Sequence, residues 1–360
     1  MTTVAAVVPR RPLRDRLGTP WLVVRRLLAV PIVMFFLASA VFVAMRLLPG
    51  SPATSLAAGG ASGDTSAAAL RENEAQINEA LGLDKSLAHQ YGSFLSDIVH
   101  LDLGTSFYGG NSIRTLLGGA LPATIELTVA AMLIAVLLGM VTGVIAALRK
   151  DTWIDNLTRS VGTVSFSLPW FALGVLAIVI FGVWLQWLPI IGRMPSALDY
   201  RPTTNFVLLD AILQDRPELI WPWFQHLILP ATTLALSMAG FITRIVRASV
   251  LEVLGDDFVR TARMKGLSGG QILRRHVLRN SSLPIVTVLG LQFGSLLGGS
   301  VITETVFSYP GVGNMLVNAI LQRDYPVVQG AALAIALLFT LVNVATDLLY
   351  LVLDPRLRKA

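Results

Sequence analysis

The sequence predicts an all-α integral membrane protein with six transmembrane helices, both termini in the cytoplasm and an external helical insertion after the first span. Hydrophobic residues make up 54% of the 360-residue chain, whereas charged residues make up only 14%, and the mean hydropathy is +0.67. A soluble domain usually carries about a quarter charged residues. The chain therefore has too little polar surface to cover a water-soluble domain, but enough to cover the ends of a helix bundle in lipid.

Six apolar stretches are long enough to cross a bilayer, whose hydrocarbon core of about 30 Å needs roughly 20 helical residues. They lie near 27–47, 127–148, 161–188, 227–245, 285–307 and 331–353. The sequence is accordingly divided into a basic N-terminus (1–26), a first span (27–48), an external insertion (49–121), a five-helix core (122–353) and a C-terminus (354–360).

The distribution of Lys and Arg predicts the orientation. With the N-terminus inside, 20 of the 28 basic residues fall in the inside segments, which are 1–26, 148–160, 244–284 and 354–360. This bias places both termini in the cytoplasm. It also argues against nucleic-acid binding, because the charge is spread over four segments as topology requires. The first apolar stretch exceeds the 7–15 residues of a signal-peptide core, so we expect it to be retained as a span.

Residues that carry chemistry in enzymes are scarce. The absence of cysteine excludes disulfides and thiolate metal sites. The four histidines lack metal-ligand spacing, and no lysine lies in a G-x-x-x-x-G-K-[S/T] phosphate loop. We therefore assign no catalytic residue, no metal site and no cofactor to this chain, and expect a transport subunit rather than an enzyme.

The insertion over 49–121 is the only long external stretch expected to form its own substructure. Its start is rich in Gly, Ser and Ala, which is typical of a flexible loop. A first amphipathic helix, ended by Gly82, has on one face Leu70, Ile77 and Leu81. A second follows the N-cap Ser86, and its apolar face comprises Leu87, Tyr91, Phe94, Leu95 and Ile98. We favour a packed cap on the bundle over a partner-docking surface or a lid, although the roles are compatible.

The most informative segment is the predicted cytoplasmic loop over 250–284, which contains DDFVRTARMKGLSGGQILRRHVLRNSSLP. Asp257 is expected to cap a short helix that begins at the next residue, and Gly266 to end it in a left-handed conformation. Ser268 and Gln271 have the spacing of a capping box that begins a second helix. The loop is therefore predicted to be a rigid element tied directly to two transmembrane helices.

This loop resembles the "EAA" loop of the permease subunits of binding-protein-dependent ABC importers, in which a coupling helix precedes a glycine. Arg260, Thr261, Ala262 and Gly266 occupy the motif, but only Ala262 and Gly266 match its general pattern strictly. The string VRTARMKGLS…RHVLRN…LP is similar to the oligopeptide/dipeptide (also nickel) branch. Five other segments resemble that branch: RLLPGSPA, GLDKSLAHQYGSFLSDIVHLDLGTSF, LPATIELT, ETVFSYPGVGNMLVNAILQRDYPVVQG and LDPRLR. The resemblance covers roughly 21–358, and the large insertion is similar to the first of the branch's two non-identical permeases.

The resemblance implies a permease of the cell (inner) membrane that takes up short peptides by alternating access. It implies as partners a homologous second permease, one or two cytoplasmic ATPase subunits that hydrolyse ATP with Mg²⁺, and an external substrate-binding protein. The coupling helix would contact the ATPase, and the predicted contact surface comprises Asp257, Phe258, Arg260, Thr261, Ala262, Lys265 and Gly266. Ala262 would permit close approach. The alternative for this loop is a basic segment held at anionic lipid headgroups.

Ionisable residues inside spans are candidates for the transport pathway, because they are costly in lipid. Glu126 and Glu304 lie near the predicted external ends of their spans, so a water-facing position is the simplest explanation for each. In the fifth span, small residues at close spacing predict tight helix packing or a smooth pathway wall, and we favour packing. They are Gly290, Gly294, Gly298, Gly299 and Ser300. Gly139 and Gly143 in the second span are expected to pack in the same way.

Two other classes remain open. A self-sufficient secondary transporter predicts inverted repeats and broken midspan helices, and the sequence shows neither. A non-transporting membrane scaffold would not need a rigid capped loop. Within the same family, nickel complexes, glutathione or sugars are alternative cargo.

Overall fold

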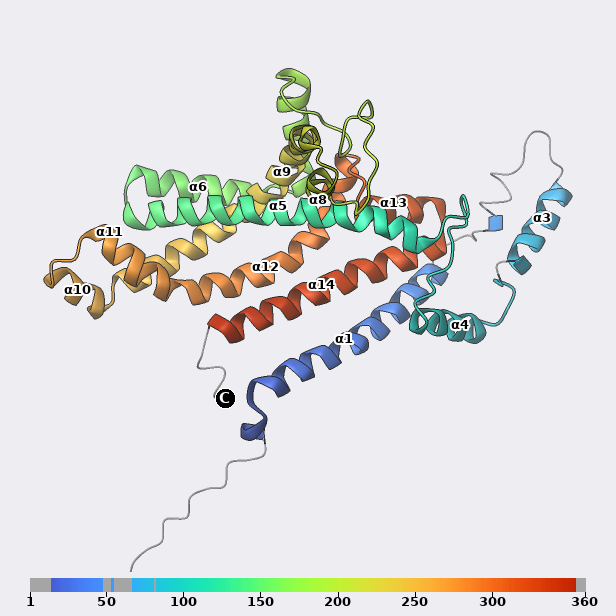
Figure 1. Cartoon of the computed structure of the whole chain (residues 1–360), viewed down its shortest axis with the longest axis horizontal. Coiled ribbons are helices and arrows are strands. Elements are labelled where there is room, and N and C mark those ends of the chain that lie inside the picture. Colours follow the sequence, from blue (N-terminus) through green and yellow to red (C-terminus); the bar gives the residue numbers. More distant parts are fainter. Residues whose placement is uncertain (1–13, 48–52, 55–66, 81, 354–360) are drawn as a thin grey trace, which may run out of the picture.

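The computed structural model describes residues 14–47, 53–54, 67–80 and 82–353, and these residues are predominantly helical (Figure 1). Their only extended pairing is a single antiparallel bridge between Thr105 and Ser112. Five helices are long and apolar enough to cross a membrane, and a bent helix pair makes six if it counts as one span. The prediction of an all-α membrane protein with six spans is therefore confirmed.

In chain order the elements are α1 (Arg14–Leu47), α3 (Ala67–Ala80), α4 (Leu87–Val99), α5 (Ile113–Leu148), α6 (Trp153–Ser167), α7 (Trp170–Ala177), the π-helix η1 (Ile178–Trp184), α8 (Val207–Leu213), the 3-10 helix η2 (Pro217–Leu219), α9 (Ile220–Leu254), α10 (Asp257–Met264), α11 (Gly269–Ile272), the π-helix η3 (Leu273–Val277), α12 (Leu278–Val306), α13 (Val312–Gln322) and α14 (Tyr325–Leu353).

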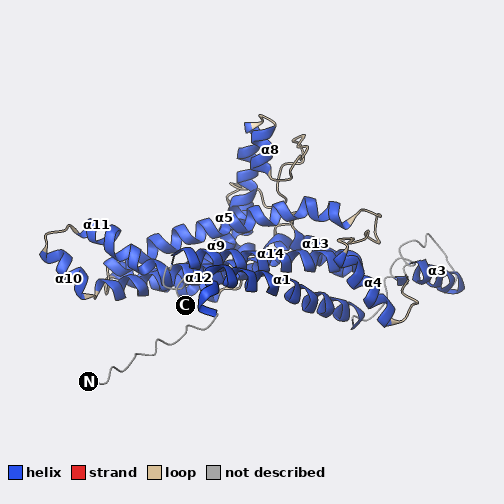
Figure 2. Ribbon diagram, turned by 60° about the horizontal axis from the view of Figure 1, so that its bottom comes forward, coloured by secondary structure: helices blue, strands red, loops and turns tan. Residues whose placement is uncertain are grey.

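The long helices lie along one axis of an elongated bundle. Figure 1 shows α10 and α11 at one end and α4 at the other, and we name the first the coupling-loop end. The first turns of α1 and the last turns of α14 point toward the coupling-loop end. Figure 2 shows α8 projecting from the side of the bundle.

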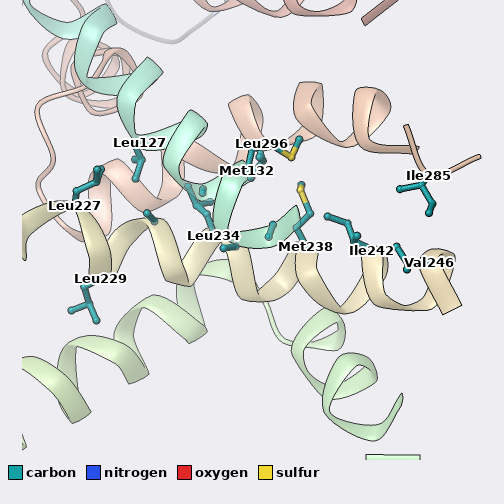
Figure 3. Packing of buried hydrophobic residues seen from close by; sticks show 14 of the residues in the cluster. Leu127, Met132, Leu227, Leu229, Leu234, Met238, Ile242, Val246, Ile285 and Leu296 are labelled. Carbon is teal, nitrogen blue, oxygen red and sulfur yellow. The ribbon is translucent and has the colours of Figure 1, made fainter. Parts of the chain in front are cut away.

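The centre of the bundle is the contact between α5 and α9, flanked by α12 (Figure 3). A Cβ atom at Gly139 would lie 2.5 Å from Ile242 Cγ2, and one at Gly143 would lie 2.7 Å from Val246 Cβ. Only glycine allows the two helices to approach this closely, so the packing role expected for both residues is confirmed. Leucine, methionine, valine and isoleucine side chains fill the remaining space, and those labelled in Figure 3 are Leu127, Met132, Leu227, Leu229, Leu234, Met238, Ile242, Val246, Ile285 and Leu296.

The second span begins earlier than predicted. α5 starts at Ile113, so the end of the predicted insertion is the first two turns of a continuous 36-residue helix. At 1.5 Å per residue this helix is about 54 Å long, well beyond a 30 Å hydrocarbon core. Pro122 lies inside it without ending it. The predicted boundary at 121 therefore falls inside a helix, because hydropathy marks the apolar part of a helix rather than its ends.

The third span is broken, which corrects two expectations. Instead of one helix over 161–188, α6 ends at Ser167 and the pair formed by α7 and η1 continues at an angle of 103°. Leu168 has φ −82° and ψ 133°, the extended conformation that a following proline imposes, and Pro169 supplies no N–H to continue the helix. The expectation that the chain has no broken helix is therefore wrong, and this argument against a secondary transporter does not hold.

The predicted insertion contacts the bundle through α4. The N-cap Ser86 and the left-handed Gly82 (φ +65°) are found where predicted. From α4, Tyr91 Oη lies 2.6 Å from Ser39 Oγ of α1, and the Tyr91 and Phe42 rings meet edge-on at 5.2 Å. α4 thus touches α1 as a cap would, but none of its residues is buried, so the packed-cap interpretation stays a prediction. Leu81 of the first predicted helix lies outside the described residues.

A second segment between the long helices also forms a substructure, contrary to expectation. The connection between η1 and α9 is organised around Asp210 of α8, which is fully buried. Its carboxylate accepts hydrogen bonds from the Thr204 amide (2.8 Å), the Thr203 amide (3.2 Å) and the Tyr200 hydroxyl (2.7 Å). The segment joins the main hydrophobic cluster through Val207, Ala211 and Leu219, and the buried carboxylate holds the preceding loop against α8.

Candidate coupling loop and pathway residues

The predicted coupling loop is a compact helical hairpin. α10 follows α9 after two residues, and four residues separate it from α11, which continues through η3 into α12. Gly266 has φ +80° and ends α10 as predicted. The Ser268 hydroxyl accepts from the Gln271 amide while the Gln271 side chain accepts from the Ser268 amide, so the predicted capping box is confirmed. The loop is thus held by its own hydrogen bonds.

The start of α10 differs by one residue from the prediction. Asp256 is the N-cap residue and Asp257 is the first residue of the helix, and neither position shows the expected side-chain cap bond. Asp257 in the first turn is still favourable, because a negative charge there interacts with the helix dipole.

Small apolar side chains hold the loop together from inside. Val259 and Ala262 are 1% and 6% exposed, and they belong to the same buried cluster as Ile272 and Val277. The Ser281 hydroxyl donates to the Ser249 carbonyl over 3.2 Å, which joins α12 to α9 just behind the loop. Ala262 therefore packs against its own loop and is not available for the close approach to a partner that we expected.

The outer face of α10 is exposed. Asp257, Arg260 and Thr261 are exposed there, as are Lys265 and Gly266 after the helix. The sequence interpretation missed Met264, which is 75% exposed although apolar. Alternation with buried Val259 and Ala262 at helical spacing was the available signal. Phe258 is 39% exposed and its ring lies 6.4 Å from that of His276.

The small residues of α12 do not form one contact surface. A Cβ at Gly294 would lie 2.6 Å from Phe339 Cε2 of α14, whereas one at Gly299 would overlap the Trp170 ring of α7. Gly298 is exposed and open, with no atom within 4 Å of its Cβ position, while Gly290 and Ser300 are buried. Two positions thus make close helix contacts, and the choice between packing and pathway for Gly298 stays a prediction.

Glu126 and Glu304 are both buried, so the expected water-facing positions are wrong. Glu126 is 8% exposed and pairs with Arg193. Glu304 is fully buried and accepts from the Thr124 hydroxyl over 2.7 Å and from the Asn314 amide over 3.0 Å. Each carboxylate is held by fixed donors of its own chain, and a pathway role for either acid stays a prediction.

An ion pair near the coupling-loop end was also missed. Asp155 of α6 is fully buried, and its two carboxylate oxygens accept from Arg247 of α9, each at 2.6 Å. Within the described residues, no three His, Asp or Glu side chains gather in a group that could hold a metal ion.

Comparison with known proteins places the chain in a family. Residues 139–359 match the binding-protein-dependent transport system inner membrane component family, and residues 21–128 match the N-terminal family of the same transport system membrane components.

Relatives of known description agree. The "Probable D,D-dipeptide transport system permease protein DdpB" of Escherichia coli K12 is 43% identical, covering 88% of this chain and 91% of its own length. The "Di/tripeptide transport system permease protein DppB" of Pseudomonas aeruginosa is 40% identical over 88% and 92%. The "Glutathione transport system permease protein GsiC" of Escherichia coli O6:H1 is 37% identical over 93% and 98%.

The fold also matches a solved structure, a chain of the MetNI methionine ABC transporter in an inward-facing conformation. The TM-score is 0.51 at 18% identity, and the match covers 67% of this chain and 97% of that one. This chain is a multi-pass inner membrane protein and belongs to the binding-protein-dependent transport system inner membrane component family, the permease subunits of ABC importers.

Proposed function

We propose that this permease takes up short peptides by alternating access, paired with a homologous permease and driven by separate ATPase subunits that contact α10. The observation that carries the proposal is the exposed face of α10 on a hairpin whose interior is buried and whose ends continue into α9 and α12. A displacement of α10 would move α9 and α12 as well, because no long flexible segment separates α10 from either helix.

The proposed contact surface follows from exposure. Met264, Arg260, Thr261 and Asp257 form the outer face of α10, and Phe258 and Lys265 flank it. A 75%-exposed methionine amid charged residues fits a protein groove, since buried anchors with a polar rim are the usual composition of an interface. Binding to lipid headgroups would need only the charged residues and would not require an exposed methionine. Ala262 would support this surface from behind, and Gly266 would form the exposed turn that ends it.

Peptide cargo is supported by the relatives, two of which are named for dipeptide or di/tripeptide transport. An external binding protein would deliver the cargo, and ATP with Mg²⁺ would be bound by the ATPase subunits. The chain itself would contribute half of the pathway and the coupling surface.

Purification of the tagged chain from its native membrane in gentle detergent tests this proposal. We expect a second permease and one or two ATPase subunits to accompany the wild-type chain. Met264→Asp and Arg260→Glu should lose the ATPase subunits but keep the second permease. The matched control Arg201→Glu changes an exposed arginine in the segment between η1 and α8, and should keep both.

Transport by the same preparations completes the test. In vesicles with binding protein, the wild type should accumulate a dipeptide only with ATP, and the α10 variants should fail to do so. A chain that purifies alone, or only with itself, and moves solute without ATP would overturn the proposal in favour of a secondary transporter.

Glutathione is a second candidate cargo, because a relative 37% identical over 93% of this chain is named for its transport. Competition between labelled dipeptide and unlabelled glutathione separates the two. Inhibition by glutathione at concentrations where dipeptides compete would favour the second candidate.

A further inference from the structure

α6 carries a stripe of polar side chains that no other described part of the chain covers. Asn156, Arg159, Ser160, Thr163 and Ser167 recur at helical spacing, and all five are exposed. We call these residues the α6 polar stripe. The neighbouring face of α6 is exposed and apolar, with Leu157 54%, Val161 55% and Val164 59% exposed. A third face packs on α9, so the helix has one side for protein, one suited to lipid and one that is polar.

The α6 polar stripe runs along most of the helix. From Asn156 to Ser167 it covers twelve residues, or about 16 Å of helix rise. That length is roughly half of a 30 Å hydrocarbon core. α6 runs beside α5 along the long axis of the bundle (Figure 1). The Thr163 and Ser167 hydroxyls donate to carbonyls one turn earlier in α6. The Arg159 guanidinium has no such bond within the helix and is open to water or a polar partner.

A cavity opens between this stripe and α9. It has a volume of about 290 Å³, and its lining includes Arg159, Thr163 and Phe166 of α6 and Phe241 and Arg244 of α9. This volume lies near the lower end of the 300–1,000 Å³ range of small-molecule sites. It suits one end of a small molecule rather than a long chain.

The charge in the cavity is unbalanced. Arg247 also lines it, but Asp155 neutralises that guanidinium through two hydrogen bonds. Arg159 and Arg244 form no ion pair with any described residue. Both guanidinium groups are exposed. The described residues leave them without an ion-pair partner, and an anionic ligand would balance their charge.

Two aromatic rings hold the Arg244 side chain in place. Its guanidinium carbon lies 5.2 Å from the centroid of the Phe241 ring and 5.8 Å from that of Phe166, and these two rings stack at 5.9 Å. Stacking on aromatic rings fixes the plane of a guanidinium while leaving its N–H groups free to donate. A planar, pre-oriented fork matches a carboxylate, which can accept two parallel hydrogen bonds.

We infer that the cavity between α6 and α9 is a carboxylate-binding station on the wall of the transport pathway, where Arg159 and Arg244 take the C-terminal carboxylate of the cargo. The inference rests on the proposed function, because it assigns the anion to a peptide. The hydroxyls of the α6 polar stripe line the approach, and the Phe166–Phe241 pair offers an apolar wall to the last side chain.

Translocation by the assembled importer in vesicles tests the station, with the binding protein saturated so that its own preference does not limit the rate. The probes are one dipeptide with a free C-terminal carboxylate and the same dipeptide as its C-terminal amide. Arg244→Gln and Arg159→Gln should each slow the free acid by about tenfold, the scale of one lost charge-assisted hydrogen bond, and the amide by less than about twofold. Arg244→Lys should retain part of the rate, and the control Arg201→Gln all of it.

The vesicle lipid separates the two sources of an anion. We expect the same selective loss in vesicles of phosphatidylcholine alone and in vesicles with added phosphatidylglycerol. An equal loss for acid and amide, present only with the anionic lipid, overturns the inference and assigns the arginines to lipid phosphate. An equal loss in both vesicles, or no loss, also overturns it while leaving peptide uptake intact. Absence of any dipeptide uptake by the wild type would instead overturn the proposed function, and this inference with it.

Discussion

Arg193 and Glu126 form a buried ion pair that ties the segment after η1 to α5. The Arg193 Nη2 atom lies 2.5 Å from Glu126 Oε2, and both side chains are 8% exposed. The Trp223 indole and the Val207 amide donate to the same carboxylate at 2.9 Å and 2.7 Å. One carboxylate therefore fixes α5, the start of α8 and the start of α9 relative to one another.

Loss of either charge of the Arg193–Glu126 pair should lower the free energy of unfolding. Arg193→Met leaves Glu126 buried without its cation, and removal of one partner from a buried ion pair typically costs about 3–5 kcal/mol. Thermal unfolding of the purified chain in detergent measures the effect. The double variant Glu126→Gln with Arg193→Met should recover part of the loss, because neither charge then remains buried alone. Additive losses in the double variant would show that the two side chains act independently.

The close contact of α5 with α9 predicts that alanine is not tolerated at Gly143. A Cβ there would lie 2.8 Å from the Thr243 carbonyl oxygen and 2.7 Å from Val246 Cβ. Overpacking of this kind typically costs about 1–3 kcal/mol, so Gly143→Ala should lower the melting temperature in detergent.

Gly119 is the matched control, because it lies in the same helix with no atom within 4 Å of its Cβ position. Gly119→Ala should be neutral or stabilising, by up to about 1 kcal/mol, since alanine is the better helix former. If both substitutions destabilise equally, steric contact with α9 is not the cause.

The segment around Asp210 should loosen in acid. Burial alone would raise the pKa of Asp210, but the amides and hydroxyls that donate to its carboxylate together hold that pKa below its ordinary value. The donors are the Thr204 and Thr203 amides and the Tyr200 and Thr204 hydroxyls. A lowered pKa in the folded state contributes stability that is present above the ordinary pKa of about 3.9 and is lost as the pH falls through the folded value.

Hydrogen exchange measures this directly. Protection of the Thr203 and Thr204 amides, corrected for intrinsic rates, should fall in the wild type as the pH drops below about 4. Asp210→Asn should show reduced protection already at neutral pH, with little further change in acid. Wild-type protection that is independent of pH down to the point of global unfolding would contradict the prediction.

Tyr200 should make the stability of the same segment depend on pH at the alkaline end as well. Burial and the hydrogen bond to Asp210 raise the pKa of its hydroxyl. The neutral phenol is therefore favoured in the folded state, and its contribution is present below the ordinary value near 10 and lost as the pH rises above it. Tyr200→Phe should remove this alkaline dependence while leaving the acid limb in place.

The parts that were predictable from sequence are those set by local patterns. The number of spans follows from apolar length, and the start of α4 and the hinge of the coupling hairpin follow from Ser86, Gly266 and the Ser268–Gln271 box. Each of these sequence signals affects only residues a few positions away, so no knowledge of contacts between distant segments was needed to interpret it.

The parts that were missed depend on contacts between distant segments. Glu126 meets Arg193 across 67 residues and Asp155 meets Arg247 across 92, and no periodicity encodes either pair. The break after α6 is an exception, because Pro169 marks it in the sequence. It was missed because the apolar stretch around it is long enough to form one continuous span. Burial of Glu304 was missed for a third reason, since its partners are largely backbone amides, which sequence does not distinguish.

Hydrogen bonds to Glu304 hold the first turn of α13, so substitution of Glu304 should have a strong local effect on that helix. Its Oε2 atom accepts from the Asn314 amide, and its Oε1 atom accepts from the Thr124 hydroxyl, which itself accepts from the Val312 amide over 2.8 Å. The carboxylate thereby satisfies backbone N–H groups that a helix start leaves without partners. A negative charge at this end also opposes the positive end of the helix dipole.

Glu304→Ala should therefore release the start of α13 more than it disturbs the rest of the bundle. The buried Asn314 amide and Thr124 hydroxyl would lose their acceptor, at a cost of about 1–3 kcal/mol for each unsatisfied group. Gly311→Ala tests the same site from the other side, because its Cβ would overlap the Glu304 carboxylate. Hydrogen exchange along α13 should accelerate in both variants, while α5 and α9 remain protected. Uniform acceleration throughout the bundle would instead show that Glu304 supports the global fold, because a cap that acts on one helix end cannot lower the protection of helices packed elsewhere.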